Sequence, residues 1–257
     1  MTDSSSPSRA AASVIVMRHN RAGSPHVLMI ERAETMQFAS GAMVFPGGGV
    51  DDADREHAAL IESRGDVEEL AARVAAVRET IEECGLILGL TNGSVKQAQL
   101  VALRSALQSG AGLAQAAAAL GLAFDFSSLV PFARWCPAAR VSRRRYDTRF
   151  FLAVTESGAF ELSPDGKETA RLAWQTAREV LDEAEAGRVK IIFPTRRNLE
   201  RLAQFESIEA LRDHALRYPV ALIEPWIESR DGEDHLCIPE GMGYPVTAES
   251  VKTALRG

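Results

Sequence analysis

Residues 67–86, VEELAARVAAVRETIEECGL, are the stretch that decides the fold of this chain. Apolar side chains recur there at steps of three and four residues, which at about 100° per residue places them on one face of a helix. They are Val67, Leu70, Val74, Val77, Ile81 and Cys84. Gly85 follows the stripe, where a left-handed residue ends a helix well. The pattern therefore predicts a helix of about five turns that ends at Gly85.

The opposite face of this helix carries three acidic side chains, Glu79, Glu82 and Glu83, spaced i, i+3, i+4. Carboxylates this close repel one another and raise each other's pKa values unless water or a cation separates them. Oxygen-only ligands without a nearby histidine or cysteine suit a hard ion such as Mg²⁺ or Mn²⁺. An ordinary solvated helix face is the alternative interpretation, and the helix alone does not decide between the two.

A glycine-rich turn precedes the helix. The short apolar run 41–45 stops at Pro46, which Gly47, Gly48 and Gly49 follow. Proline and successive glycines disfavour a continuing strand and leave the backbone amides and carbonyls unobstructed. The next stretch, residues 50–66, is acidic and irregular, so we expect a loop with one helical turn.

Farther out, alternating and apolar runs separated by turn formers predict strands. Residues 13–19 and 26–32 form a predicted hairpin, and strands are expected at 129–135, 146–155 and 169–174. Helices are expected at 176–185 and from Pro194 onward. The predicted fold class is α/β, a mixed sheet flanked by helices.

The predicted domain organisation is one domain, residues 13–257, after a disordered tail at residues 1–12. The alanine- and leucine-rich segment 94–122 is interpreted as two inserted helices, and residues 195–257 as a C-terminal helical extension.

Composition excludes several classes of protein. The 257 residues are 46% hydrophobic and 25% charged, as in a globular protein, and the net charge of -6 argues against nucleic-acid or anionic-membrane binding. No apolar run approaches the roughly 20 residues of a membrane span. The three cysteines are far apart and form no C-x-x-C pair, so neither a zinc site nor a disulfide framework is indicated, and a reducing cytoplasm fits best.

The string RETIEECGL at residues 78–86 resembles the second half of the Nudix box, R-E-U-x-E-E-x-G-U, where U is aliphatic. Thr80 departs from the pattern at an aliphatic position. FPGGG at residues 45–49 resembles the segment that often leads into the box. The resemblance implies an α/β/α sandwich and a divalent-metal hydrolase of diphosphate linkages.

The spacing of the box departs from the usual one. The chain runs 30 residues from Gly48 to Arg78, about sixteen more than the usual box. Counted back from Arg78, the position of a loop-supporting glutamate is filled by Leu70, which puts that support in doubt. In three features the chain resembles a subgroup of the family that includes peroxisomal coenzyme A diphosphatases. These features are the insertion in the box, the segment VFPGGGVDDAD and the segment RRRYDTRFFLA. The C-terminal ALRG is not a peroxisomal signal, which again favours the cytoplasm.

The resemblance implies roles for individual residues. The Gly47 carbonyl and the carboxylates of Glu79, Glu82 and Glu83 would bind Mg²⁺ or Mn²⁺, and Arg78 would pair with one glutamate and fix its direction. One carboxylate, or a water between metals, would supply the nucleophile. Gly48 and Gly49 would keep the loop open.

Weaker candidates lie outside the box. Glu168 is a candidate loop ligand for the metal, with an exposed glutamate as the alternative. Arg32, and Arg145 at the end of a basic run, are candidate substrate contacts because guanidinium groups pair well with phosphates. A solvated loop is the alternative for the basic run.

The leading hypothesis is hydrolysis of a nucleotide-type small molecule, first coenzyme A or acyl-coenzyme A, and second ADP-ribose or a dinucleotide such as NADH. A non-catalytic Nudix-fold binding module is the alternative class. A di-iron helical protein would require Glu-x-x-His pairs, which this sequence lacks. Oligomeric state stays open; members of the superfamily often dimerise, and the C-terminal helices offer a surface for a homodimer.

Overall fold

The structure is a computed structural model that describes residues 8–21, 23–36, 39–61, 65–91, 94–137, 145–156 and 162–254. In chain order the elements are β1 (Arg9–Asn20), β2 (Gly23–Arg32), β3 (Met43–Val44), β4 (Gly47–Gly49), α1 (Asp52–Ile61), α2 (Val67–Cys84), α3 (Gln97–Gln108), α4 (Leu113–Ala119), β5 (Val130–Trp135), β6 (Tyr146–Val154), β7 (Thr169–Thr176), α5 (Ala177–Glu185), α6 (Phe193–Leu202), α7 (Ile208–Arg217), β8 (Leu222–Ile223), β9 (Trp226–Arg230), β10 (Glu233–Cys237), β11 (Ala248–Ser250) and α8 (Val251–Ala254).

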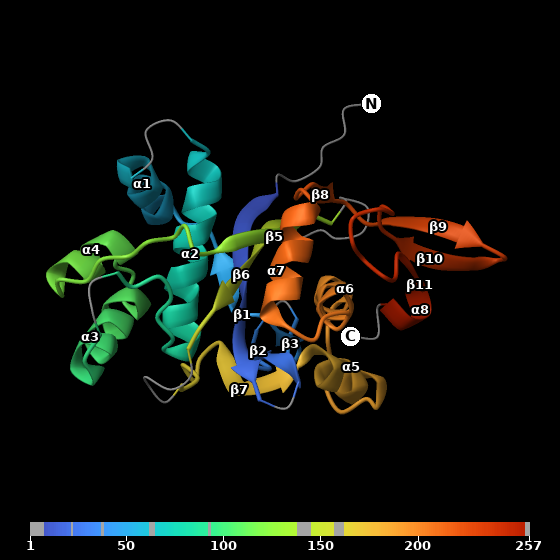
Figure 1. Cartoon of the computed structure of the whole chain (residues 1–257), viewed down its shortest axis with the longest axis horizontal. Coiled ribbons are helices and arrows are strands. Elements are labelled where there is room, and N and C mark those ends of the chain that lie inside the picture. The colour runs from blue at the N-terminus through green and yellow to red at the C-terminus, as the bar shows by residue number, and fades with distance from the viewer. Residues whose placement is uncertain are drawn as a thin grey trace.

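A mixed sheet forms the centre of the molecule. Its strand order is β3-β2-β1-β6-β5-β8, with β4 paired to β1 and β7 paired to β2. Strand β1 is antiparallel to β2, as the predicted hairpin requires, and parallel to β6. Helices α1 to α4 lie on one side of the sheet and α5 to α7 on the other (Figure 1). The predicted mixed α/β class with helices on both faces is confirmed.

Alternation along the strands divides the core into two halves. In β1, Val14 and Val16 pack on the side of α2, whereas Ile15 and Met17 pack on the side of α5 to α7. Successive side chains of a strand point to opposite faces, so a sheet covered on both sides needs apolar residues at every position. This explains why the run SVIVM shows no polar alternation.

Helix α2 has the predicted extent. The Asp66 side chain accepts a hydrogen bond from the Glu69 amide at its start, and Gly85 takes the left-handed conformation, with φ of 69°, at its end. Val74, Val77 and Ile81 are fully buried against the sheet. Helix α2 therefore presents a buried apolar face and a second face toward β4.

Two predictions on the N-terminal side are wrong. Strand β1 begins at Arg9, so residues 9–12, assigned to a disordered tail, belong to the sheet, where Ala11 and Ala12 pair with both β4 and β6. Pairing on both edges outweighs the low strand propensity of alanine. The acidic segment forms the ten-residue helix α1 rather than one turn; it packs on α2 through a face too narrow to show as a periodicity.

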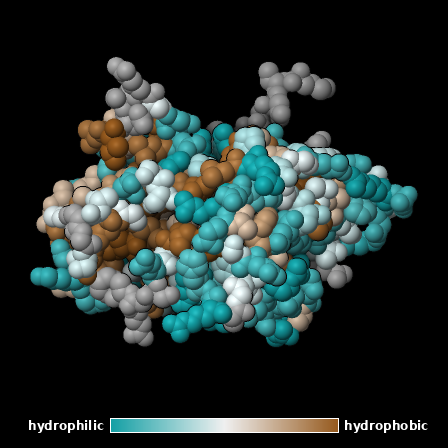
Figure 2. Space-filling view, viewed as in Figure 1, coloured by the Kyte–Doolittle hydropathy of each residue, from teal (hydrophilic) through white to brown (hydrophobic). Residues whose placement is uncertain are grey.

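Residues 94–122 contain α3 and α4. The predicted C-terminal helical extension is only partly helical, because β9, β10 and β11 form a separate antiparallel sheet after α7. Asp231 and Gly232, both with positive φ, make the turn between β9 and β10, a combination that favours tight hairpins. Figure 2 shows a mainly hydrophilic surface over this sheet, whereas apolar residues gather on the side of α1 to α4.

No helix in the described part of the chain is both long and apolar enough to cross a membrane.

Candidate active site

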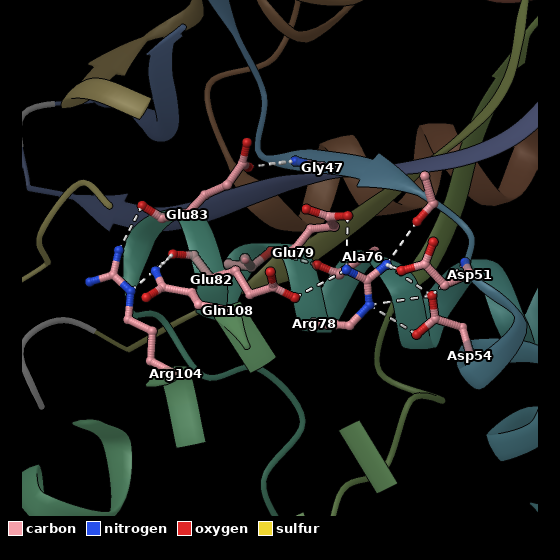
Figure 3. A network of polar contacts seen from close by, with 12 residues as sticks. Gly47, Asp51, Asp54, Ala76, Arg78, Glu79, Glu82, Glu83, Arg104 and Gln108 are labelled. Carbon is pink, nitrogen blue, oxygen red and sulfur yellow. Dashed lines mark hydrogen bonds and ion pairs between the residues drawn. The ribbon is translucent and has the colours of Figure 1, made fainter. Parts of the chain in front are cut away.

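The site forms where the last turns of α2 lie beside the glycine strand β4 (Figure 3). The hydroxyl of Ser13 on β1 donates to the Pro46 carbonyl at 2.9 Å and fixes the bend that leads into β4. A Cβ on Gly47 would lie 2.3 Å from the Ala12 carbonyl oxygen, and one on Gly48 would lie 2.3 Å from a Glu79 carboxylate oxygen. Both glycines therefore permit a close approach that other residues would obstruct.

Glu83 is the most enclosed of the three glutamates. Its residue is 3% exposed, and its carboxylate accepts a hydrogen bond from the Gly47 amide at 2.9 Å. Burial, reinforced by the negative charge of Glu79, raises the pKa of Glu83 well above its usual value. An additional positive charge at this position would stabilise the ionised carboxylate.

Glu79 and Glu82 share one guanidinium nitrogen. Nη1 of Arg78 donates to Glu79 at 2.9 Å and to Glu82 at 3.0 Å. Burial raises the pKa of Glu79 to about 7 in spite of this contact, and burial also raises the pKa of Glu82. Arg78 thus holds the directions of two carboxylates, where the resemblance had implied one.

Asp54 anchors Arg78 from the other side. Its carboxylate accepts from Arg78 Nε at 3.1 Å and from Nη2 at 2.9 Å, while Nη2 also donates to the Gly49 carbonyl at 2.8 Å. Asp54 is fully buried and Arg78 is 6% exposed. This ion pair links α1, α2 and β4 in one network.

Sequence reasoning missed Asp54, although a signal was present. Counting back from Arg78 placed the supporting acid of the box at Leu70. Counting forward from Gly48 with the same spacing places it at Asp54. The extra residues of the box therefore come after this acid, and the loop support that seemed lost is supplied by α1.

The atoms available for binding a metal are carboxylate oxygens beside exposed backbone, which is the type of ligand that a hard divalent cation prefers. Within the described ranges, however, no three His, Cys, Asp or Glu side chains are grouped as a metal site. Arg78 holds Glu79 and Glu82, and the Gly47 amide holds Glu83. An ion would have to draw these carboxylates from their present partners. The contact seen at Gly47 uses its amide, and metal binding by its carbonyl stays a prediction.

Two of the weaker candidates, Glu168 and Arg32, lie close enough to Glu83 for their charges to act on it. The negative charge of Glu168 raises the pKa values of Glu79 and Glu83, and the positive charge of Arg32 lowers the pKa of Glu83. Arg32 ends β2 and pairs with Thr169 on β7, while the Ala33 amide donates to the Glu168 carbonyl at 2.8 Å. The sheet register therefore brings both residues to the site.

Arg145 is engaged elsewhere. Its Nε donates to the Pro137 carbonyl at 2.8 Å, and its Nη2 lies 3.5 Å from a Glu224 carboxylate oxygen. These contacts tie the start of β6 to the segment after β5, and its predicted role in substrate binding has no support from them. Arg140, Arg143 and Arg144 of the same basic run lie outside the described residues.

This fold and glutamate helix are those of a Nudix hydrolase. A solved NUDIX hydrolase from Alicyclobacillus acidocaldarius is similar with a TM-score of 0.69 and 29% identity, over 81% of this chain and 96% of that one. The family model of the NUDT19 Nudix domain matches residues 61–202, more than half of the chain. The chain belongs to this family of Nudix proteins.

Two curated relatives show a comparable level of sequence identity. "Acyl-coenzyme A diphosphatase NUDT19" of Gallus gallus is 27% identical over an alignment 179 residues long, which covers 62% of this chain and 47% of that protein. "Putative nudix hydrolase 7" of Caenorhabditis elegans is 29% identical over 199 residues, 76% of this chain and 61% of that protein. The chain spans only about half to three fifths of the length of these relatives.

Proposed function

We propose that this chain hydrolyses a diphosphate linkage in a nucleoside diphosphate derivative with the help of Mg²⁺ or Mn²⁺. The observation that carries the proposal is the arrangement of Glu79, Glu82 and Glu83 on the last turns of α2 beside the glycine strand β4. Enclosed carboxylates occur at functional sites and also in structural ion pairs, so the support comes from their position beside the open backbone of β4.

In this proposal Glu79, Glu82 and Glu83 hold the divalent ion, and Glu168 is a further ligand. The ion would neutralise charge on the phosphate oxygens and make a bound water more acidic. Asp54 holds Arg78, and Arg78 directs Glu79 and Glu82 toward β4. A carboxylate of the cluster accepts the proton of the attacking water. Arg32, whose positive charge acts on Glu83, contacts a substrate phosphate.

The first proposed substrate is coenzyme A or an acyl-coenzyme A. Its support is the match to the NUDT19 Nudix domain and to a relative named acyl-coenzyme A diphosphatase. ADP-ribose or a dinucleotide such as NADH is the second candidate, because the proposed site recognises the diphosphate and not the group attached to it. A cytoplasmic location stays a prediction, supported by three free, buried cysteines, Cys84, Cys136 and Cys237.

The test is product release from coenzyme A, acyl-coenzyme A, ADP-ribose and NADH, each with Mg²⁺, with Mn²⁺ and with a chelator. We expect turnover only with metal and fastest with the coenzyme A compounds. Glu82→Gln should abolish it, whereas Glu183→Gln, which alters an exposed glutamate paired with Arg188 on α5, should not. A folded wild-type protein that is inert on every compound would favour the non-catalytic binding module instead.

A further inference from the structure

The inserted helix α3 reaches the end of α2 mainly through Arg104, beside which Gln108 Nε2 donates to the Glu82 carbonyl at 3.3 Å. Arg104 Nε donates to the Glu82 carbonyl at 2.9 Å, and its Nη2 donates to the Glu83 carbonyl at 3.1 Å (Figure 3). On the other side, Nη1 donates to the Ser163 hydroxyl at 2.8 Å and Nη2 to the Ser163 carbonyl at 2.9 Å. One guanidinium therefore bridges two chain segments that are distant in sequence.

The first segment is the end of α2. The last carbonyls of a helix lack partners within it, and a cation there also interacts favourably with the helix dipole. Arg104 satisfies the carbonyls of Glu82 and Glu83, and the Ser163 amide donates to the Cys84 carbonyl at 3.2 Å. The last turn of α2, which bears Glu82 and Glu83, thus depends on α3 and on the loop before β7.

The second segment is this loop, residues 162–168, which carries Glu168. The Asp165 carboxylate accepts hydrogen bonds from the amides of Lys167, Glu168 and Thr169, the last at 2.8 Å. At its far end the loop is tied to β2 through the bond from the Ala33 amide to the Glu168 carbonyl. With Ser163 held by Arg104 and Glu168 bonded to Ala33, the loop is fixed at both ends.

We propose that Arg104 is a positioning residue for hydrolysis, through which the inserted helix α3 locks the Glu168 loop against the end of α2. The inference rests on the proposed function and gives the insertion a role in it. A guanidinium suits the role because its planar fork donates in several directions at once. A lysine would reach only one of the two segments, so Arg104→Lys should rescue little.

The experiment compares Arg104→Gln and Arg104→Lys with the wild type by steady-state kinetics and by amide hydrogen exchange. We expect kcat to fall by about 10- to 100-fold with KM changed by less than about twofold, because the catalytic groups are displaced and not removed. The amides of residues 167–169 should exchange faster in both variants. Ser163→Ala, which removes one bond of the bridge, should lower kcat by only about threefold.

Arg188→Gln is the matched control, because it removes the same charge from a surface ion pair with Glu183, just after the end of α5; it should change neither kcat nor loop exchange. A purely structural role would lower the melting temperature and leave kcat unchanged at temperatures where the variants are folded, and that result would overturn the proposal. Unchanged loop exchange in folded Arg104→Gln would do the same. Hydrogen exchange needs no turnover, so it tests the bridge even if the proposed hydrolysis fails.

Discussion

Two networks of buried charge, one on each side of the sheet, have similar electrostatics and different surroundings. On α2, Arg78 pairs with Asp54, Glu79 and Glu82. On α6, Arg197 is 2% exposed and pairs with Glu200 at 2.7 Å and with Glu249 of β11 at 3.0 Å. Each network joins elements that are far apart in the sequence.

The two networks cannot be told apart by pKa. Burial is the largest cause in both, and it raises the pKa of Glu79 and that of Glu200 alike to about 7. They differ in their neighbours: Glu79 lies against a glycine strand with an open backbone, whereas Glu200 lies between α6 and the C-terminal sheet. A raised pKa therefore reports burial, and the neighbouring backbone distinguishes the candidate active site from a structural ion pair.

The largest expected difference is in activity. Glu82→Gln should lower kcat/KM by at least about 100-fold, since it removes a proposed metal ligand, with little change in melting temperature. Glu200→Gln should leave kcat/KM within about twofold. Both variants would be assayed on the best diphosphate substrate. Equal losses in the two variants would remove the distinction between the networks.

The next effect is on stability. Asp54→Ala leaves Arg78 buried without its main partner, so the free energy of unfolding should fall by about 3 kcal/mol. Denaturant unfolding would measure it. Asp52→Ala on the same helix is the control, because the Asp52 side chain is exposed and pairs only weakly with Arg55. A loss no larger than that of the control would show that Glu79, Glu82, Asp51 and the Gly49 carbonyl hold Arg78 without Asp54.

A smaller effect concerns the dependence of stability on pH. The pKa of Glu200 is raised from 4.5 to about 7 in the folded state, so the folded state binds more protons than the unfolded state between these values. The stability contribution of Glu200 is therefore full below pH 4.5 and is lost as pH rises through about 7. As pH rises from 4.5 to about 7, the unfolding free energy of Glu200→Gln should therefore increase relative to that of wild type by roughly 1–2 kcal/mol. The increase is modest because partial solvent access screens the charge.

Unfolding curves at pH 4.5 and pH 8 for both proteins would measure that gain. A constant difference between wild type and Glu200→Gln at the two pH values would contradict the raised pKa.

The smallest expected stability change is at Gly48. Its added Cβ in Gly48→Ala meets the far end of the flexible Glu79 side chain and not backbone, so the unfolding free energy should change by less than about 1 kcal/mol. Activity should fall about tenfold, because Glu79 is moved from its position beside β4. Gly49→Ala, where a Cβ meets nothing within 4 Å, is the control. Full activity in Gly48→Ala would show that the close approach is not required.

Local sequence was sufficient wherever the determining forces are local. Apolar periodicity, the cap at Gly85 and the glutamate spacing defined α2 and its acidic face, because a helix is built from contacts three and four residues apart. The prediction that the glycines after Pro46 leave extended structure is wrong, because Gly47–Gly49 pair with β1 as strand β4, and local turn propensity does not include that pairing. Family resemblance added the Nudix fold, which the structure and the match to residues 61–202 bear out.

Only the tertiary structure decided which distant residues complete the site. Asp54 reaches Arg78 across 24 residues, and Arg104 reaches the α2 carbonyls from an inserted helix. The register of β2 with β7 brings Arg32 and Glu168 to the glutamates, while the Pro137 carbonyl and Glu224 hold Arg145 elsewhere. Such contacts depend on how the helices and strands pack against one another. Periodicity and spacing along the chain do not predict which charged side chains of two packed elements will meet.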